Sequence, residues 1–278
     1  MSVRQNLAKD QSRLALVLAS MVLVLGLSGC ASTGTKDTMT TGSIPTLTKP
    51  VDQMTPAEVA SATETMGRAY AKTPKSPQIG IAYANLLQMS NRAPQALAVM
   101  QQVAISNPTD RQVLGAYGKA QAAAGQLEQA LATLTRAQTP DRPDWRLYSA
   151  QGAVFDQLGR AQDARSAYQQ ALQIQPNEPS VLSNMGMSYV LSGDLKTAET
   201  YLRTATQQPG ADSRVRQNLA LVVGLQGRFD EADKIARQEL SPDQAEANVA
   251  YLRTMLSQQN AWKQLAAKDG AAAQNPVR

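Results

Sequence analysis

Few side chains in this chain could do chemistry. The sequence has one cysteine, Cys30, and no histidine. Without histidine, Ser–His–Asp triads, Cys–His pairs and His-ligated metal sites are all excluded. The acidic residues Asp230, Glu231 and Glu128 lie beside predicted turns, where solvated surface charge is a better interpretation than a catalytic carboxylate pair. We therefore expect no enzyme, no catalytic residue, no metal and no cofactor apart from a covalent lipid.

The thiol of Cys30 lies where a lipid attachment site is expected. Residues 1–13 carry a basic cluster, and residues 14–27 form an almost wholly apolar run, too short for a comfortable membrane span. The run leads into Leu27-Ser28-Gly29-Cys30, which resembles the lipobox of bacterial lipoproteins. This resemblance implies cleavage before Cys30 and acylation of its sulfur. An ordinary signal peptide with a chance cysteine, or an uncleaved anchor, is the alternative interpretation.

The residues after the lipobox predict a tether and a location in the cell. Residues 30–55 are rich in Thr, Ser, Gly and Pro and show no hydrophobic periodicity, which is typical of a flexible linker. Residue 31 is Ala rather than Asp, a choice similar to that of Gram-negative lipoproteins sorted to the outer membrane. We expect a lipid-anchored protein that faces the periplasm. The net charge of +5 gives no case for a nucleic-acid partner, because such partners need a concentrated basic face.

A helix-turn-helix unit repeats along the rest of the chain. In residues 145–176 the apolar side chains have the i, i+3, i+4, i+7 spacing of two amphipathic helices that meet at Gly159. Steps of 34 residues from Ala164 land on alanine each time, and the same steps from Gly159 land on glycine or asparagine. The alanines are Ala96, Ala130, Ala198 and Ala232, and the turn residues are Asn91, Gly125, Gly193 and Gly227. One hairpin cannot bury its apolar faces alone, so neighbouring copies must stack.

This pattern resembles the tetratricopeptide repeat (TPR) family, whose helix-turn-helix unit has a period of 34 residues. The central copy matches the family's pattern of large, small and aromatic positions with Tyr148, Gly152, Phe155, Ala164, Tyr168, Ala171 and Pro176. The resemblance implies an all-α fold, a right-handed superhelical solenoid of about five full repeats. A half-repeat precedes them, and a capping helix covers the C-terminal end of the stack.

The repeat frame sets the predicted domain boundaries. They are 1–29 for a lipoprotein signal peptide, 30–55 for the tether, 56–262 for the repeat array and 263–278 for a disordered tail. The full repeats are 77–110, 111–144, 145–178, 179–212 and 213–246, with the half-repeat at 56–72 and the cap at 242–259.

A protein-binding groove is predicted on the first helices of the repeats. By resemblance to the family, positions 2, 5, 6, 9 and 12 of each repeat line the concave face. The candidate binding residues are Gln112, Lys119, Arg146, Asn184, Met187, Arg214, Gln217, Asn218 and Leu221. Amide and guanidinium groups suit an extended peptide backbone or a carboxylate. For each residue alone a solvated surface side chain is the better interpretation, and the prediction is made for the groove as a whole. The family's two-carboxylate clamp is absent, since Ile81 and Ala116 stand where Lys and Asn are needed.

The C-terminal repeats carry a closer resemblance. Residues 193–256, with the runs GDLKTAETYLRTA and GRFDEADKIARQEL, resemble the TadD family, the TPR lipoproteins of tight-adherence (Tad, or Flp) pilus assembly systems. This resemblance implies a periplasmic scaffold that helps the pilus secretin or other Tad components to localise or assemble. The same module in outer-membrane β-barrel assembly, or in the regulation of cell-wall enzymes, is the alternative.

Overall fold

The computed structural model describes residues 54–274, with side chains described as far as residue 258. Within this part of the chain there are twelve α-helices, α2 to α13, and the only β-type pairing is an isolated bridge between Thr139 and Arg142. Cys30, the predicted signal peptide and almost all of the predicted tether lie outside the described residues. None of the described helices is long and apolar enough to cross a membrane.

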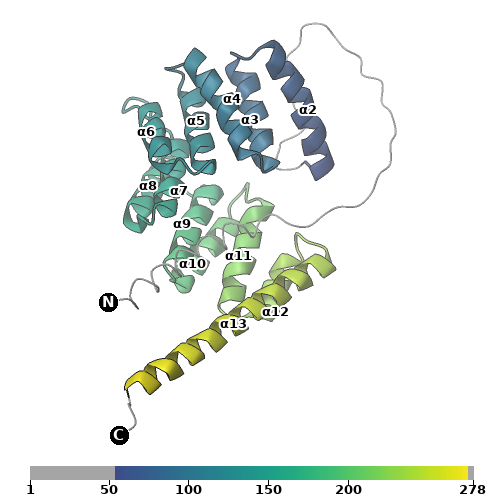
Figure 1. The fold of residues 1–278 in the computed structure, drawn as a ribbon, viewed down its shortest axis with the longest axis vertical. Helices are drawn as coiled ribbons and strands as arrows, with labels where there is room; N and C mark the ends of the chain where they lie inside the picture. Colours follow the sequence, from purple (N-terminus) through teal and green to yellow (C-terminus); the bar gives the residue numbers. More distant parts are fainter. Residues whose placement is uncertain (1–53, 275–278) are drawn as a thin grey trace. The chain divides into compact units, whose positions relative to one another are not determined.

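The helices follow one another as hairpins along the chain (Figure 1). Their bounds are α2 (Pro56–Lys72), α3 (Pro77–Met89), α4 (Ala93–Ser106), α5 (Arg111–Ala123), α6 (Leu127–Ala137), α7 (Trp145–Gln157), α8 (Ala161–Ile174), α9 (Pro179–Leu191), α10 (Leu195–Thr206), α11 (Ser213–Leu225), α12 (Phe229–Ala236) and α13 (Pro242–Gln274). Each predicted full repeat holds one pair, from α3–α4 to α11–α12, and α2 occupies the predicted half-repeat.

A capping side chain starts the first helix of every repeat. The N-cap residues recur every 34 positions, and the side chain of each accepts a hydrogen bond from a backbone N–H of the first helical turn. They are Ser76, Asp110, Asp144, Glu178 and Asp212. Before them, Thr55 and Glu58 form a capping box on α2, in which the Thr55 backbone N–H donates to the Glu58 carboxylate at 2.7 Å.

The turn inside each repeat confirms the predicted spacing. Gly159 ends the first helix of the central repeat with φ at 73°, in the left-handed region that a glycine enters without strain. The equivalent residues of the other repeats are also left-handed, with φ between 56° and 83°: Asn91, Gly125, Gly193 and Gly227.

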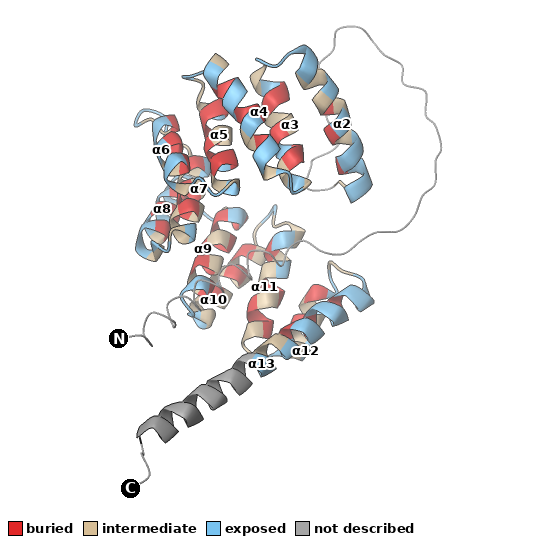
Figure 2. Cartoon of the chain, viewed as in Figure 1, coloured by how far each residue is buried: buried red, intermediate tan, exposed pale blue. Residues whose placement is uncertain are grey.

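Small residues bring the two helices of each repeat together. The alanines spaced 34 residues apart are buried, from 0% exposed at Ala164 to 1% at Ala232, so the predicted packing frame is confirmed. Buried residues occupy the surfaces between the helices, and exposed residues the outward surfaces (Figure 2). Leu86, Met100, Leu134, Tyr168 and Leu202 are among the largest fully buried side chains. The core therefore runs through successive repeats rather than filling one central space.

Successive repeats pack through both kinds of helix. The second helix of one repeat packs on the first helix of the next, as α4 does on α5 and α8 on α9. The first helices also contact one another in series, α3 with α5, α5 with α7, α7 with α9 and α9 with α11. These contacts place the first helices side by side, so that their side chains can form one shared surface.

The last helix covers the end of the stack but is longer than the sequence predicts. α13 packs on α11 and α12 and buries Ala245, Val249 and Leu252, while Met255 and Leu256 are half-buried. The predicted cap ends at residue 259, with a disordered tail from residue 263, whereas the helix continues to Gln274. The physical reason is composition: alanine, glutamine and lysine favour helix, and one internal glycine costs only about 1 kcal/mol.

Candidate functional site

Two adjoining cavities lie along the first helices in the N-terminal and central repeats. One, of about 560 Å³, is lined mainly by α5 and α7, with Gln88 of α3 and Asn184 of α9 at its ends. The other, of about 850 Å³, is lined by α3, α5, the start of α7 and the loop before it. Lys119 and Arg146 line both cavities. We call this combined hollow the central groove.

Lys119, a predicted groove residue, extends from α5 into the hollow. Its side chain is accessible to solvent, yet the surrounding groove walls desolvate it and lower the pKa of its amine. The carboxylate of Asp144 opposes this shift and the Arg146 guanidinium adds to it. Among residues 54–258, no carboxylate forms an ion pair with this amine. Lys119 is therefore a partly desolvated cation without a partner.

Arg146 lies opposite, on the first turn of α7. Its guanidinium is 4.5 Å from the centroid of the Trp145 ring and 4.0 Å from the Asp144 carboxylate. The side chain is 64% exposed, so this long contact with Asp144 contributes little and leaves most of the donors of Arg146 available. The stacking on Trp145 restrains the guanidinium at the edge of the groove.

Three other charged residues of the central groove are engaged by the protein itself, whereas Arg142 is exposed and lies 3.5 Å from the Asp141 carboxylate. Arg111 donates from Nε to the Ala137 carbonyl oxygen at 2.9 Å and from a terminal nitrogen to the Arg142 carbonyl oxygen at 2.6 Å. It thereby fixes the loop before α7. Asp110 and Asp144 are N-caps whose carboxylates accept backbone hydrogen bonds. These residues build the groove walls.

Asn184 and Asn218 have a packing role in this structure. The Asn184 amide donates to the Ser149 hydroxyl at 3.1 Å, and the Asn218 amide donates to the Ser183 hydroxyl at 3.0 Å. Both bonds join a first helix to the preceding first helix at the same repeat positions. Asn184 also lines the central groove, whereas Asn218 does not.

The remaining predicted groove residues lie at different places. Gln112 is exposed and lines the larger cavity. Arg214, Gln217, Met187 and Leu221 line neither cavity: Arg214 is ion-paired with its neighbour Asp212 at 2.7 Å, and Gln217 donates to Ser213 on its own helix. Met187 and Leu221 are half-buried, and Met187 packs against the core of the C-terminal repeats.

Among the lining residues that sequence reasoning missed are Arg111, Arg142 and Trp145. Trp145 is the first residue of α7, directly before Arg146, so an aromatic next to a groove arginine was an available signal. Arg142 belongs to the irregular junction between the second and third repeats, whose path no periodicity describes.

Asp156 is a half-buried carboxylate at the joint of α7, α8 and α9. Tyr168 donates to one of its oxygens at 2.9 Å and Ser188 donates to the other at 2.7 Å. Burial raises the pKa of Asp156, and burial together with the Asp156 charge raises the pKa of Tyr168. The hydroxyl donors satisfy the carboxylate, which ties two repeats together.

Within the described part of the chain, no three His, Cys, Asp or Glu residues form a group that could hold a metal ion.

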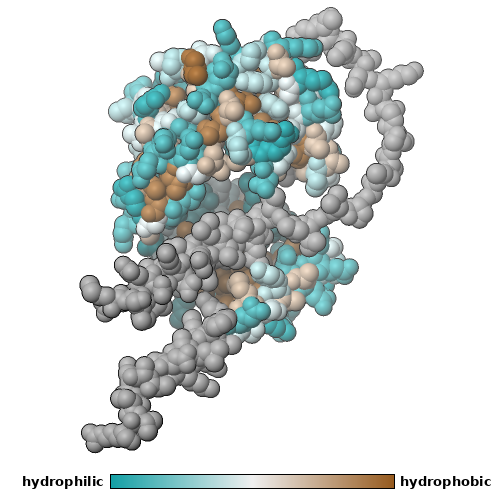
Figure 3. Space-filling model, viewed as in Figure 1, coloured by the Kyte–Doolittle hydropathy of each residue, from teal (hydrophilic) through white to brown (hydrophobic). Residues whose placement is uncertain are grey.

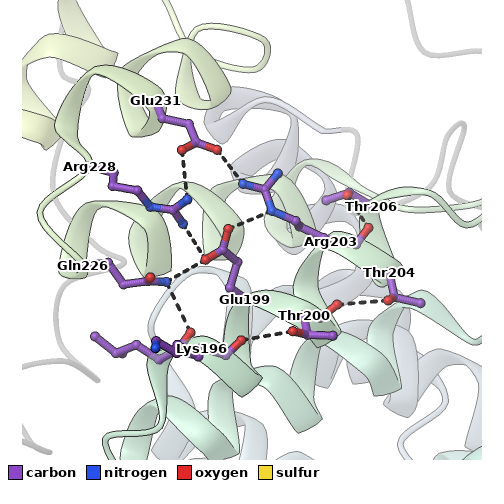
Figure 4. Close-up of polar contacts among 10 residues, drawn as sticks. Lys196, Glu199, Thr200, Arg203, Thr204, Thr206, Gln226, Arg228 and Glu231 are labelled. Atoms are coloured by element: carbon purple, nitrogen blue, oxygen red, sulfur yellow. Dashed lines mark hydrogen bonds and ion pairs between the residues drawn. The ribbon is translucent and has the colours of Figure 1, made fainter.

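A second polar cluster joins the fourth and fifth repeats (Figure 4). Arg203 contacts Glu199 at 2.7 Å and also pairs with Glu231, while Arg228 pairs with both of these carboxylates. Hydrogen bonds from Arg228, Gln226 and Arg203 hold the pKa of Glu199 down at about 2. All five residues fall within residues 193–256, and their contacts hold two neighbouring repeats together.

Large apolar side chains on the surface are dispersed. They lie on five different helices: Met89 on α3, Ile105 on α4, Ile174 on α8, Leu191 on α9 and Tyr251 on α13. In the face that Figure 3 presents, hydrophilic surface surrounds separate apolar spots. The polar central groove is thus a better-formed candidate site than any apolar patch on these helices.

Family comparisons agree with this architecture. A tetratricopeptide repeat model matches residues 157–222, and a tetratricopeptide repeat-like domain model matches residues 12–188, more than half of the chain. The chain belongs to the tetratricopeptide repeat-like family. TPR domains are protein-interaction scaffolds, typically without catalysis, and neither matching model describes an enzyme. No curated protein matches the sequence.

Solved structures share the TPR fold at low sequence identity. A thermophilic TPR protein of Thermus thermophilus has a TM-score of 0.53 and 22% identity, over 60% of this chain and 91% of its own. PilW, a widely conserved type IV pilus biogenesis factor, has a TM-score of 0.51 and 17% identity, over 72% of this chain and 91% of its own. The human IFIT1 dimer with m7Gppp-AAAA has a TM-score of 0.56 and 14% identity, over 66% of this chain and 46% of its own. At these identities the likeness shows the fold alone.

Proposed function

We propose that this TPR protein is a lipid-anchored scaffold of the outer membrane, facing the periplasm, that assists assembly of a Tad (Flp) pilus. Its partners are then envelope proteins, the pilus secretin or other Tad assembly components. The observation that carries the proposal is the combination, on one chain, of a lipobox ending at Cys30 with a repeat array whose residues 193–256 resemble the TadD family.

The described surface suits a scaffold. The first helices of the array lie side by side, and the central groove on them presents Lys119 and Arg146 without a full complement of partners. PilW, a type IV pilus biogenesis factor, has the same fold, so pilus assembly already uses this architecture elsewhere. A lipid on Cys30 would hold the array at the membrane in which a secretin must assemble.

Deletion of the gene, followed by fractionation of the secretin, tests this function. We expect fewer secretin multimers in the outer-membrane fraction and fewer Flp pili on the surface, with both restored by the full-length gene. A plasmid that expresses the Cys30→Ser protein is the matched control for anchoring, and we expect it to restore neither. Normal secretin multimers and normal pili in the deletion strain would rule the proposal out.

A further inference from the structure

We propose that α13 pairs with the α13 of a second copy of this chain, with the two helices antiparallel. The contact is an apolar stripe of α13 that consists of Tyr251, Met255, Trp262 and Leu265. This pairing surface is separate from the central groove, and the argument for it does not depend on a role in pilus assembly.

The repeat array covers one side of α13 and leaves another side open. Ala245, Val249 and Leu252 are buried where α13 packs on α11 and α12. Tyr251 lies within the same turns of the helix, yet it is 48% exposed. A single exposed aromatic side chain needs no explanation, so the case rests on the pattern that Tyr251 begins.

Tyr251 is the first member of a regular series along the helix. Met255 follows four residues later and is half-buried, and the sequence then places Trp262 and Leu265 at further steps of seven and three residues. Steps of three, four and seven keep residues on one side of an α-helix, as in the seam of a coiled coil. The helix runs without a break through all of these positions, so they share one side of it, with Gln258 between them.

The array supports only the first part of α13. Among residues 242–258, whose side chains are described, the buried ones end at Leu252, whereas the helix continues past α11 and α12 to Gln274 (Figure 1). Helices in proteins gain most of their stability by packing an apolar side rather than from intrinsic propensity. The positions of Trp262 and Leu265 belong to this further part, where a second helix would supply the packing.

The charge of α13 favours a second α13 over other partners. Residues 242–258 have a net charge of −1, and residues 259–274 have a net charge of +1. The charged residues are Asp243, Glu246 and Arg253 in the first part, and Lys263, Lys268 and Asp269 in the second. Antiparallel pairing places unlike parts side by side, whereas parallel pairing places like parts together. Because the helix is neutral as a whole, neither an anionic lipid surface nor a strongly charged protein is attracted along its full length.

An antiparallel pair centred on Gln258 matches the stripe to itself. About that centre the position of Tyr251 lies opposite that of Leu265, and the position of Met255 lies next to that of Trp262. Each contact then occurs twice, as a two-fold axis requires, and the pair closes as a dimer rather than growing into a filament. The Gln258 amide meets its own copy, and an amide both donates and accepts hydrogen bonds.

Disulfide cross-linking of the full-length protein in isolated membranes tests the pairing and its direction. Gln258→Cys places a thiol at the proposed centre, and copper phenanthroline joins thiols whose Cα atoms lie within about 7 Å. We expect this variant to give a covalent dimer on a non-reducing gel. Ala247→Cys lies on the same side of the helix, but its two copies would be about 33 Å apart in an antiparallel pair, so we expect no dimer. The controls are the parent, with Cys30 alone, and Ser257→Cys, an exposed neighbour on another side of the helix.

Light scattering of the full-length protein, purified in detergent and separated by size, tests the apolar stripe. We expect the parent to be a dimer at micromolar concentration, and Tyr251→Ser combined with Trp262→Ser to raise the dissociation constant at least about tenfold. Met89→Ser removes another exposed apolar side chain, on α3, and should leave the dimer intact. Circular dichroism melts check that the array of each variant remains folded.

Four results would overturn the inference. They are a monomeric parent, an undiminished dimer in the folded double variant, no covalent dimer from Gln258→Cys, and a Gln258→Cys product that contains a different protein. A dimer from Ala247→Cys as abundant as that from Gln258→Cys would overturn the antiparallel direction. Secretin and pili in the deletion strain report on the proposed function separately, so either result can fail while the other stands.

Discussion

A methyl group on Gly152 would lie 2.5 Å from Cε1 of Tyr168. Carbon atoms do not approach one another that closely, so the glycine on α7 is what allows the tyrosine of α8 to lie in its observed position. The same relationship recurs one repeat earlier between Gly118 and Leu134, at 2.7 Å, and one repeat later between Gly186 and Leu202, at 2.8 Å. A glycine opposite a large side chain is thus a packing rule of the central repeats.

Replacing Gly152 by alanine should destabilise the array. Tyr168 is fully buried and its hydroxyl is held by Asp156, so the ring cannot move aside freely. We expect a fall in the free energy of unfolding of about 1–3 kcal/mol, typical of overpacking. Urea denaturation followed by circular dichroism measures this fall, with the exposed Gln157→Ala of the same helix as the control. An unfolding midpoint for Gly152→Ala that equals the control's would contradict the packing rule.

The repeat frame could be predicted because it depends on local chemistry. Gly159 marks a left-handed turn and Ala164 marks a close helix contact, and both requirements act within one hairpin. The far end of α13 could not be predicted in the same way. Its composition is compatible with a helix or with a disordered tail, and composition alone does not decide between the two.

Ala164→Arg tests the repeat frame at one of its fully buried alanine positions. The alanine side chain is 0% exposed between α7 and α8, so an arginine there must either bury its charge or force the helices apart. We expect a loss of several kcal/mol, a large share of the stability of a single domain. Thermal melts measure it, with Gln162→Arg, exposed on the same helix, as the matched control. Equal melting temperatures for the two variants would show that the frame is misplaced.

Glu199 should make the C-terminal repeats sensitive to acid. Its pKa is about 2 in the fold, held down first by the hydrogen bond from Arg228, against 4.5 for an unperturbed glutamate. A lowered pKa in the folded state means that the carboxylate stabilises the fold fully above pH 4.5, and that this contribution is lost as the pH falls towards 2.

Urea unfolding at a series of pH values detects this contribution. We expect Glu199→Gln to reduce stability at neutral pH and to flatten the loss of stability below pH 4.5 relative to the parent. Glu128→Gln, a change at an exposed glutamate on α6, is the matched control. If the Glu199→Gln and parent curves stay parallel down to pH 2, the fold does not lower the pKa of Glu199 and the prediction is wrong.

The candidate site was only partly predictable from the sequence. Repeat positions place Lys119 and Arg146 on the first-helix surface, because that surface follows from helix periodicity. Periodicity does not say where the surface is hollow, or which side chains the protein has already engaged. Arg214 is ion-paired with Asp212, and Arg142 reaches the groove from an irregular loop. Both facts depend on how the side chains are placed in three dimensions.

Asn184 and Ser149 should be energetically coupled, because the asparagine amide donates to the serine hydroxyl at 3.1 Å between two first helices. A double-mutant cycle of Asn184→Ala and Ser149→Ala measures the coupling by urea denaturation. We expect about 0.5–1.5 kcal/mol, the net worth of a typical intramolecular hydrogen bond. The equivalent pair Asn218 and Ser183 should give a similar value. If the effects of the two single substitutions simply add in both cycles, neither asparagine has a packing role.

Cys30→Ser should abolish lipid attachment and leave the array folded. The lipobox resemblance requires a thiol at this position, because the lipid is joined through sulfur, and serine offers only a hydroxyl. The buried side chains of the described array lie between Val59 and Leu252, and we expect them to pack without the Cys30 thiol. Metabolic labelling with radioactive palmitate should mark the parent and not the variant, and the variant should leave the membrane fraction while its melting temperature stays unchanged. Palmitate label in the Cys30→Ser protein would refute the lipobox interpretation.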